Sequence, residues 1–360
     1  MNKVLSVLQT LYAAYGYQRY KVSQFESYDL YVENRNFLQS AKILTFHDTN
    51  GQLMALKPDV TLSIIKNTKP DAKLSKVYYT ENVYREPKSG DGYQEIPQTG
   101  LELIGTVGEY ELCEVLMLAE RSLRAISDHY VLDISHIGVL SGLLAAESLE
   151  DAQCAALMNA AGQKNPHLIA ELCGRYGLSD SFCRTLCTLV GLYGTPEQVL
   201  SQAEALNLPP ESRSAMRQLR RLDQFLANTG CRNVHLDFSL VNDMDYYSGL
   251  VFRGFVEGIA SGVLSGGCYD RLLSKMGRSG NAIGFAVYLD QLERLYPSQH
   301  EFDVDIAIYY RSDCDVGALL QLTQRLTGQG STVRVCPVGT SGIFARKKML
   351  FETTEGSYFD

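Results

Sequence analysis

The stretch EIPQTGLELIG, residues 95–105, has the two-residue alternation of a β-strand in the middle of a sheet. Successive side chains of a strand point to opposite faces, so Gln98, Gly100 and Glu102 share one face. Leu101 and Leu103 share the other face and are expected to pack against the core. The sequence therefore predicts a sheet that is apolar on one side and polar on the other.

Other polar side chains lie on segments that are expected in the same sheet. They are Arg85, Glu95, Asp245, Tyr246, Tyr247 and Tyr269. Carboxylates, an amide and tyrosines suit a small zwitterionic ligand, because its ammonium group needs anions and its ring needs aromatic walls. The alternative interpretation is a solvated sheet face that binds nothing.

The flanking sequence up to residue 135 mixes helical and strand patterns. The first fifteen residues have the spacing of an amphipathic helix and lack the apolar run of a signal peptide. A hairpin is predicted to turn at Asn50-Gly51, with a helix that begins after Pro58. Two extended runs follow and are joined by a turn-rich loop.

The rest of the chain divides into a helical part and a return to strands. Residues 137–230 are rich in Ala, Leu, Gln and Glu and predict an insertion of several short helices. Residues 301–360 predict a small α/β unit of strand, helix and strand. Its polar last residues are expected to fray or to form an edge strand. The preceding residues 1–300 are expected to form the core.

Composition and charge exclude several classes of protein. The length of 360 residues suggests two or three structural units. A net charge of −8 argues against a large nucleic-acid-binding surface. Nine cysteines, an odd number spread along the chain, favour a reducing, cytoplasmic location. No segment has the roughly 20 apolar residues that cross a bilayer.

The sequence predicts no metal site and no cofactor. Its six histidines do not follow metal-binding spacings, and neither a Walker loop nor a nucleophile elbow is present. Cys183 and Cys187 lie one helical turn apart and are expected in the core. The glycines of GVLSGG, residues 262–267, are expected to let two backbones, or a backbone and a ligand, approach closely.

With these residues in view, the chain resembles the class II aminoacyl-tRNA synthetases, and in particular the histidyl branch. MALKPDVT (residues 54–61) resembles the loop that holds the amino group of histidine, which implies roles for Asp59 and Thr61. NVYREPKSGDGYQEIPQTGLELIG (residues 82–105) resembles the second class II motif. That match implies Arg85 as a phosphate-facing arginine and Gln98 and Glu102 as amino-acid ligands.

Three later segments extend the resemblance to about residue 296. NDMDYYSGLVF (residues 242–252) resembles the histidine-specific segment and implies Tyr246 and Tyr247 at the ligand. SGGCYDRLL (residues 265–273) resembles the loop that brings a tyrosine, here Tyr269, to the imidazole. AIGFAVYLDQLERL (residues 282–295) resembles the third motif. The resemblance implies an α+β fold with an antiparallel sheet flanked by helices.

The departures from the synthetase pattern remove positive charge. Asn242 stands where the synthetases have an arginine that stabilises the reacting carboxylate and phosphate, and Gln291 stands where they have an arginine against the ATP phosphates. The loop of the second motif, usually basic, offers Asp91, Gly92, Tyr93 and Gln94. Removing one preorganised charge-stabilising donor typically costs about 3 to 4 kcal/mol in catalysis, so amino-acid activation is not expected.

The pattern of a retained amino-acid pocket and a dismantled nucleotide site resembles the regulatory subunits of ATP phosphoribosyltransferase. This resemblance implies a non-catalytic homodimer that assembles with the short catalytic subunit, responds to L-histidine and binds no tRNA. The tail is also shorter than a full anticodon-binding domain. Two alternatives stay open: a divergent histidyl-tRNA synthetase, and a synthetase-like protein recruited to another role.

Overall fold

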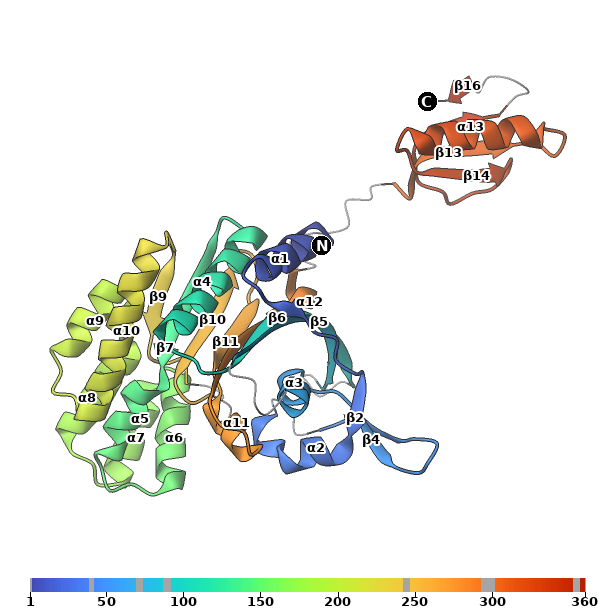
Figure 1. Cartoon of the computed structure of the whole chain (residues 1–360). Coiled ribbons are helices and arrows are strands. Elements are labelled where there is room, and N and C mark those ends of the chain that lie inside the picture. The colour runs from blue at the N-terminus through green and yellow to red at the C-terminus, as the bar shows by residue number, and fades with distance from the viewer. Residues whose placement is uncertain are drawn as a thin grey trace. The chain divides into compact units, whose positions relative to one another are not determined.

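The alternating stretch lies in strand β6 (Gln94–Gly105), inside the largest sheet of the described residues (Figure 1). The computed structural model describes residues 2–38, 42–68, 74–86, 92–241, 247–292, 302–351 and 357–359. It divides the chain into two compact units, Met1–Leu295 and Tyr296–Asp360.

The large sheet has nine strands in the order β1-β5-β6-β12-β11-β10-β7-β9-β8. Neighbouring strands from β5 to β7 are antiparallel, whereas β1 is parallel to β5 and β9 is parallel to β7. The antiparallel sheet expected from the sequence is confirmed. The remaining bounds are β1 Gln18–Arg19, β5 Leu74–Arg85, β12 Asn281–Tyr288, β11 Leu264–Cys268, β10 Leu250–Val256, β7 Tyr130–His136, β9 Val234–Asp237 and β8 Tyr193–Gly194.

One face of this sheet packs against helices α1 (Asn2–Ala14) and α4 (Glu109–Ile126). Leu101 of β6 is fully buried on that face, and Tyr12 of α1 meets the ring of Phe285 at 5.9 Å. The alternation of β6 turns Glu102 to the opposite face. The apolar side of the predicted sheet is therefore part of the core, as expected.

A smaller sheet and two helices lie between α1 and β5 in sequence. The hairpin of β3 (Thr45–His47) and β4 (Leu53–Leu56) turns through Gly51, whose φ of 77° suits glycine. This hairpin and the helix after Pro58 are confirmed. The other elements here are β2 Phe25–Ser27, α2 Tyr28–Glu33, the 3₁₀ helix Arg35–Phe37 and α3 Thr61–Asn67.

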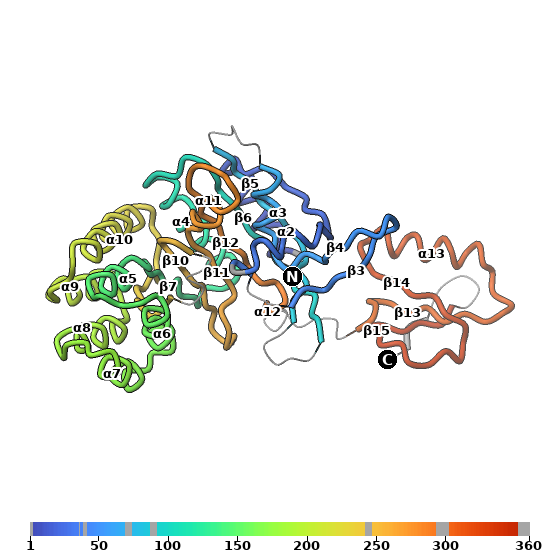
Figure 2. Tube along the Cα trace, turned by 90° about the horizontal axis from the view of Figure 1, so that it is seen from below, coloured from blue at the N-terminus to red at the C-terminus, as the bar shows by residue number. Residues whose placement is uncertain are grey.

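Helices occupy most of residues 137–230 and gather beside β7 (Figure 2). This confirms the predicted helices, although α10 is long and the short strand β8 was not expected. Cys183 and Cys187 are half-buried, so their assignment to the core was wrong. The helices are α5 Ile137–Ala145, α6 Asp151–Gly162, α7 Pro166–Arg175, α8 Asp180–Gly191, α9 Pro196–Glu204 and α10 Pro210–Asn228.

The C-terminal unit contains the predicted strand, helix and strand around its own core of Ile306, Ile308, Leu319 and Met349. The expected fraying or edge strand was wrong in part, because β15 lies inside the sheet order β14-β13-β15-β16. Burial of Met349 explains that position. The bounds are β13 Val304–Tyr310, α13 Val316–Gly328, β14 Val333–Pro337, β15 Ala345–Leu350 and β16 Ser357–Phe359.

Two short helices complete the described elements of the first unit. Helix α11 (Asp270–Lys275) follows β11, and helix α12 (Leu289–Leu292) follows β12. No helix in the described residues is both long and apolar enough to cross a membrane.

Candidate functional site

The polar face of the large sheet carries a pocket of about 380 Å³ that is partly open to solvent. Strands β6, β12 and β11 supply its floor, and α3 supplies one wall. Its lining residues are Thr61, Tyr79, Arg85, Gln98, Glu102, Tyr247, Ser265, Tyr269, Gly284, Phe285, Ala286 and Tyr288. The sheet thus brings together segments that are more than 200 residues apart in sequence.

Glu102 lies at the centre of the pocket and is only 3% exposed. Thr61 Oγ1 donates a hydrogen bond of 2.7 Å to Glu102 Oε1, and Tyr269 Oη donates one of 2.6 Å to Oε2. The neighbouring strand leaves room for this carboxyl because it has glycine there. A Cβ atom on Gly284 would lie 1.8 Å from Glu102 Oε2.

Burial raises the pKa of Glu102 to about 8, although the hydrogen bonds from Tyr269 and Thr61 oppose the rise. The nearby Asp59 carboxyl also contributes to this rise. A pKa of about 8 leaves this carboxyl largely protonated at neutral pH. A cationic ligand group would favour its ionised form, because opposite charge compensates for lost hydration.

Asp59 and Arg85 form a second charged feature of the site. Asp59 is 8% exposed, and its Oδ1 accepts a hydrogen bond of 2.9 Å from the backbone N–H of Leu62. Burial raises the pKa of Asp59, and the Arg85 guanidinium, 3.9 Å away, lowers it. Arg85 Nε also donates to the carbonyl oxygen of Pro58 at 2.7 Å, which fixes the guanidinium beside the acid.

Gln98 supplies an unsatisfied polar group. Its side chain is 3% exposed and lines the pocket, and its Nε2 has no hydrogen-bond partner among the described residues. Buried polar atoms are nearly always paired in folded proteins. This buried donor at the pocket wall is available to a hydrogen-bond acceptor in the pocket.

Tyr247 and Tyr269 form aromatic walls and are 8% and 1% exposed. Gly267 makes the position of Tyr247 possible, since a Cβ atom there would lie 2.7 Å from Tyr247 Cδ1. A Cβ atom on Gly266 would lie 2.5 Å from the backbone oxygen of Gly284. The expected close approach is confirmed at these two glycines for neighbouring protein groups, but it was wrong for Gly262, where a Cβ atom would have only ordinary contacts from 3.6 Å.

The structure places most of the predicted site residues in or beside this one pocket. Six of them line the pocket: Thr61, Arg85, Gln98, Glu102, Tyr247 and Tyr269. Asp59 is not a lining residue, but its carboxylate lies 3.9 Å from the guanidinium of Arg85. Asn242, Asp245 and Tyr246 lie outside the described residues. The interpretation of this face as solvated was wrong at Gln98 and Glu102, which are buried.

Two other residues of the sequence analysis do not line the pocket. Glu95 is exposed near the start of β6 and accepts a hydrogen bond of 3.0 Å from Tyr84 Oη. Gln291 lies in α12, where its Oε1 accepts a hydrogen bond of 2.6 Å from Ser261 and its Nε2 donates to Asp290 at 2.7 Å. The Gln291 side chain is thus held by neutral and acidic neighbours.

Several lining residues were not predicted. Gly284, Ala286 and Tyr288 alternate along β12, and Tyr79 and Ser265 come from β5 and β11. The two-residue period of β12 was visible in the sequence. It would have identified Gly284, Ala286 and Tyr288 only if the pairing of β12 with β6 had been known.

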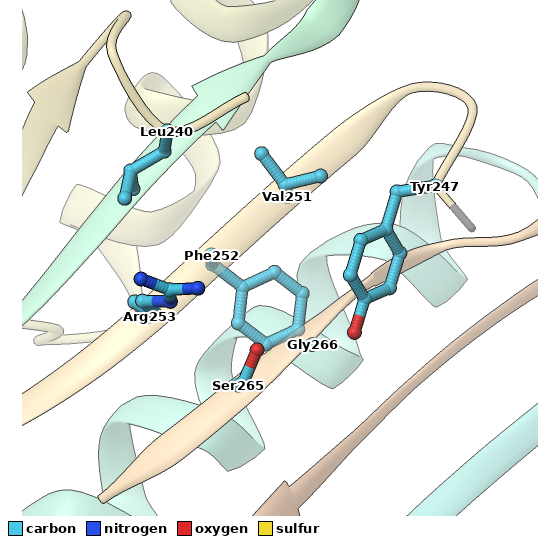
Figure 3. A pocket seen from close by; sticks show the side chains of 7 residues that line it. All are labelled: Leu240, Tyr247, Val251, Phe252, Arg253, Ser265 and Gly266. Atoms are coloured by element: carbon cyan, nitrogen blue, oxygen red, sulfur yellow. The ribbon is translucent and has the colours of Figure 1, made fainter. Parts of the chain in front are cut away.

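A second pocket of about 260 Å³ adjoins the first and shares Tyr247 and Ser265 with it (Figure 3). Its lining residues are Leu240, Tyr247, Val251, Phe252, Arg253, Ser265 and Gly266. In the part of the chain that the structure describes, no group of three His, Cys, Asp or Glu residues is arranged to hold a metal ion.

Comparison with known proteins gives consistent matches. The family model described as histidyl-tRNA synthetase matches residues 1–292. A protein of Desulforamulus reducens named ATP phosphoribosyltransferase regulatory subunit is 31% identical over 340 residues, covering 90% of this chain and 82% of its own.

Solved structures show the same fold. An ATP phosphoribosyltransferase regulatory subunit/histidyl-tRNA synthetase from Bacillus halodurans has a TM-score of 0.78 at 24% identity, covering 95% of this chain and 89% of that one. A chain of the ATP phosphoribosyl transferase (HisG:HisZ) complex from Thermotoga maritima has a TM-score of 0.64 at 20% identity. This match covers 80% of this chain and 96% of that one.

Proposed function

Because the chain belongs to the histidyl-tRNA synthetase family, among the ATP phosphoribosyltransferase regulatory subunits, we propose that it regulates the first step of histidine biosynthesis. Its partner is the short catalytic subunit of ATP phosphoribosyltransferase. Membership of this family over nearly the whole chain is the observation that carries the proposal. The chain acts as a homodimer within the complex, in the cytoplasm.

The ligand of the pocket is L-histidine. The acids Asp59 and Glu102 suit its ammonium or imidazole nitrogens, and the unpaired Gln98 amide suits an acceptor. Tyr247 and Tyr269 supply aromatic walls for the ring. These groups recognise a zwitterion with a polar ring, and binding there conveys feedback by the end product to the catalytic subunit.

The chain does not itself activate an amino acid. Asn242 and Gln291 are neutral, and Gln291 is engaged by Ser261 and Asp290. Two absent charge-stabilising groups would cost about 6 to 8 kcal/mol if their effects add, roughly 10⁴- to 10⁶-fold in rate. The net charge of −8 also disfavours tRNA binding.

The test compares phosphoribosyltransferase activity of the short catalytic subunit with and without this chain. Activity is expected to rise when the chain is added and to fall again with L-histidine only when the chain is present. Gln98→Leu is expected to raise the inhibitory histidine concentration about 10-fold, since one hydrogen bond to a charged group is lost. Arg175→Met, an exposed change in α7, is the matched control.

The second candidate is a divergent histidyl-tRNA synthetase, which the matching family model favours. Histidine-dependent exchange between ATP and pyrophosphate separates the two functions. Robust exchange by the chain alone would show that the chain activates histidine. It would refute the proposal that the chain is a non-catalytic regulatory subunit. Absence of exchange, together with stimulation of the catalytic subunit, supports it.

A further inference from the structure

Three of the nine cysteines lie together in the helical part of the chain, and none of them lines the candidate pocket. Cys173 belongs to α7, and Cys183 and Cys187 belong to α8. A side-chain hydrogen bond links the Cys173 thiol to Cys183, and a second one links the Cys187 thiol to Cys183. Cys183 is thus the central thiol of the cluster and has a sulfur neighbour on each of the two helices.

Helices α7 and α8 pack against each other as an antiparallel hairpin. The Cys187 thiol donates a weak hydrogen bond of 3.9 Å to the carbonyl oxygen of Pro166, the first residue of α7. Cys173, near the end of α7, instead meets Cys183 in the first turn of α8. These two contacts fix the register of the hairpin and place Cys173 opposite Cys183.

The two sulfur neighbours of Cys183 are not equivalent for a covalent bond. Residues four apart on one helix have Cβ atoms about 5 to 6 Å apart, whereas a disulfide needs about 3.5 to 4.5 Å. A bond between Cys183 and Cys187 would therefore require α8 to unwind. Cys173 and Cys183 face each other from separate helices, so a bond between them leaves the backbone hydrogen bonds of both helices in place.

Exposure and pKa give the three thiols different parts. Cys173 is 2% exposed, whereas Cys183 and Cys187 are half-buried. Burial raises the pKa of the Cys173 thiol and of the Cys187 thiol, and the neighbouring Cys183 adds to both rises. A thiol of raised pKa holds little thiolate and is a slow first attacker. Cys183 combines partial exposure with contact to Cys173, so it is the thiol that meets an oxidant from solvent.

We propose that Cys173 and Cys183 form a site of reversible disulfide exchange with low-molecular-weight disulfides such as glutathione disulfide. The Cys183 thiolate attacks one sulfur of the small disulfide, forms a mixed disulfide and releases the other half as a thiolate. The Cys173 thiolate then attacks the Cys183 sulfur and displaces the second small thiolate. Two protein thiols are oxidised to one disulfide, one small disulfide is reduced to two thiols, and the protons lost by the cysteines pass to the released thiolates.

The chemistry of the cluster favours this bond over a metal site. Among the residues that the structure describes, no three His, Cys, Asp or Glu side chains are arranged to hold a metal ion. Disulfides in reducing compartments are transient and report the redox state, and excess small thiol reverses them. While it lasts, the bond between Cys173 and Cys183 fixes α7 against α8. The modification does not depend on the proposed regulatory role.

Peptide mapping after oxidation tests this pairing. The full chain is incubated with glutathione disulfide at about pH 8.5, near the ordinary pKa of a thiol, and the remaining thiols are blocked with iodoacetamide. Cleavage after Lys and Arg puts the three cysteines on separate peptides, residues 165–175, 176–184 and 185–213. Joined peptides 165–175 and 176–184 are expected in about 10-fold or greater excess over joined peptides 176–184 and 185–213, because only the first pair meets disulfide geometry without unwinding a helix.

Cys173→Ser separates the two steps of the exchange. Cys183 is then expected to stop at the mixed disulfide, so glutathione on peptide 176–184 should rise about 10-fold over the unaltered chain. Cys173→Ala repeats the test without burying a hydroxyl, and circular dichroism checks that each variant is folded. Cys187→Ser is expected to leave the cross-link in place. Cys154→Ser, at a half-buried thiol of α6, is the matched control and should change nothing.

Three results overturn the proposal. The first is a dominant link between Cys183 and Cys187. The second is the absence of a link between Cys173 and Cys183 in the unaltered chain, whether or not Cys183 carries glutathione. The third is a link between Cys173 and Cys183 that appears only after unfolding in urea, because it would then owe nothing to the packing of α7 against α8.

Discussion

Replacing Glu102 with Gln is expected to change how stability depends on pH. The substitution keeps the size of the side chain and removes its titration. In the folded chain burial raises the pKa of Glu102 from 4.5 to about 8, and the carboxyl is 3% exposed. In the unfolded chain it titrates near 4.5. The folded state therefore binds more protons than the unfolded state between these two pH values.

The direction and size of the effect follow from this difference. The contribution of the group is fully present below pH 4.5 and is lost as the pH rises through about 8. A rise of the pKa from 4.5 to about 8 corresponds to about 5 kcal/mol at 1.36 kcal/mol per unit. Relative to Glu102→Gln, the unaltered chain should lose roughly this free energy of unfolding between pH 5 and pH 9.

Urea unfolding at several pH values between 5 and 9 measures this loss. Circular dichroism is the suitable signal, since the chain has no tryptophan. Glu171→Gln, a change at an exposed carboxyl of α7, should leave the pH dependence of the unaltered chain in place. Parallel stability curves for the unaltered chain and Glu102→Gln would refute the raised pKa and the electrostatic argument built on it.

Three further substitutions test the packing around the site. Tyr269→Phe removes the hydrogen-bond donor to Glu102 and should lower the free energy of urea unfolding by about 1 to 3 kcal/mol. Because that bond lowers the pKa of Glu102, the pH-dependent loss of stability should also extend to higher pH. An unchanged dependence of stability on pH would contradict the bond. Gly284→Ala brings a Cβ to 1.8 Å from the Glu102 carboxyl. It should lower the free energy of thermal unfolding by about 1 to 3 kcal/mol and should also weaken histidine binding. Unchanged stability and unchanged binding would contradict the close approach. Lys57→Met removes the ion-pair partner of Glu81, which lies 2.5 Å from the buried Lys57 ammonium, and should lower the free energy of unfolding by about 3 to 5 kcal/mol. Adding Glu81→Gln should recover much of that loss. Equal stability of the single and double variants would argue against the pair.

Much of the local structure was predictable because it depends on neighbours in sequence. The two-residue period of residues 95–105 predicted which side chains of β6 share a face, and the structure has Leu101 in the core and Glu102 in the pocket. Asn50-Gly51 predicted its hairpin because glycine there adopts a positive φ. Helical periodicity likewise predicted α1 and the helices of residues 137–230.

Other features depend on contacts that no local pattern encodes. Strand β15 was expected at an edge because its sequence is polar, yet pairing with β13 and β16 places it inside its sheet. The alternation of β6 puts Glu95 on the same face as Leu101 and Gln98 on the face of Glu102, but it does not say which of the two polar residues is buried. One is exposed beside Tyr84, and the other is buried in the pocket.

The sequence by itself determined the elements of the core, the polar face of β6 and the resemblance from which the site residues were inferred. Only the tertiary structure decided that β12, β11 and β10 follow β6 in the sheet, and so that Gly284 and Arg253 belong to the same face as Glu102. It also decided the pKa of Glu102, because burial raises a pKa only when distant segments exclude water from the carboxyl.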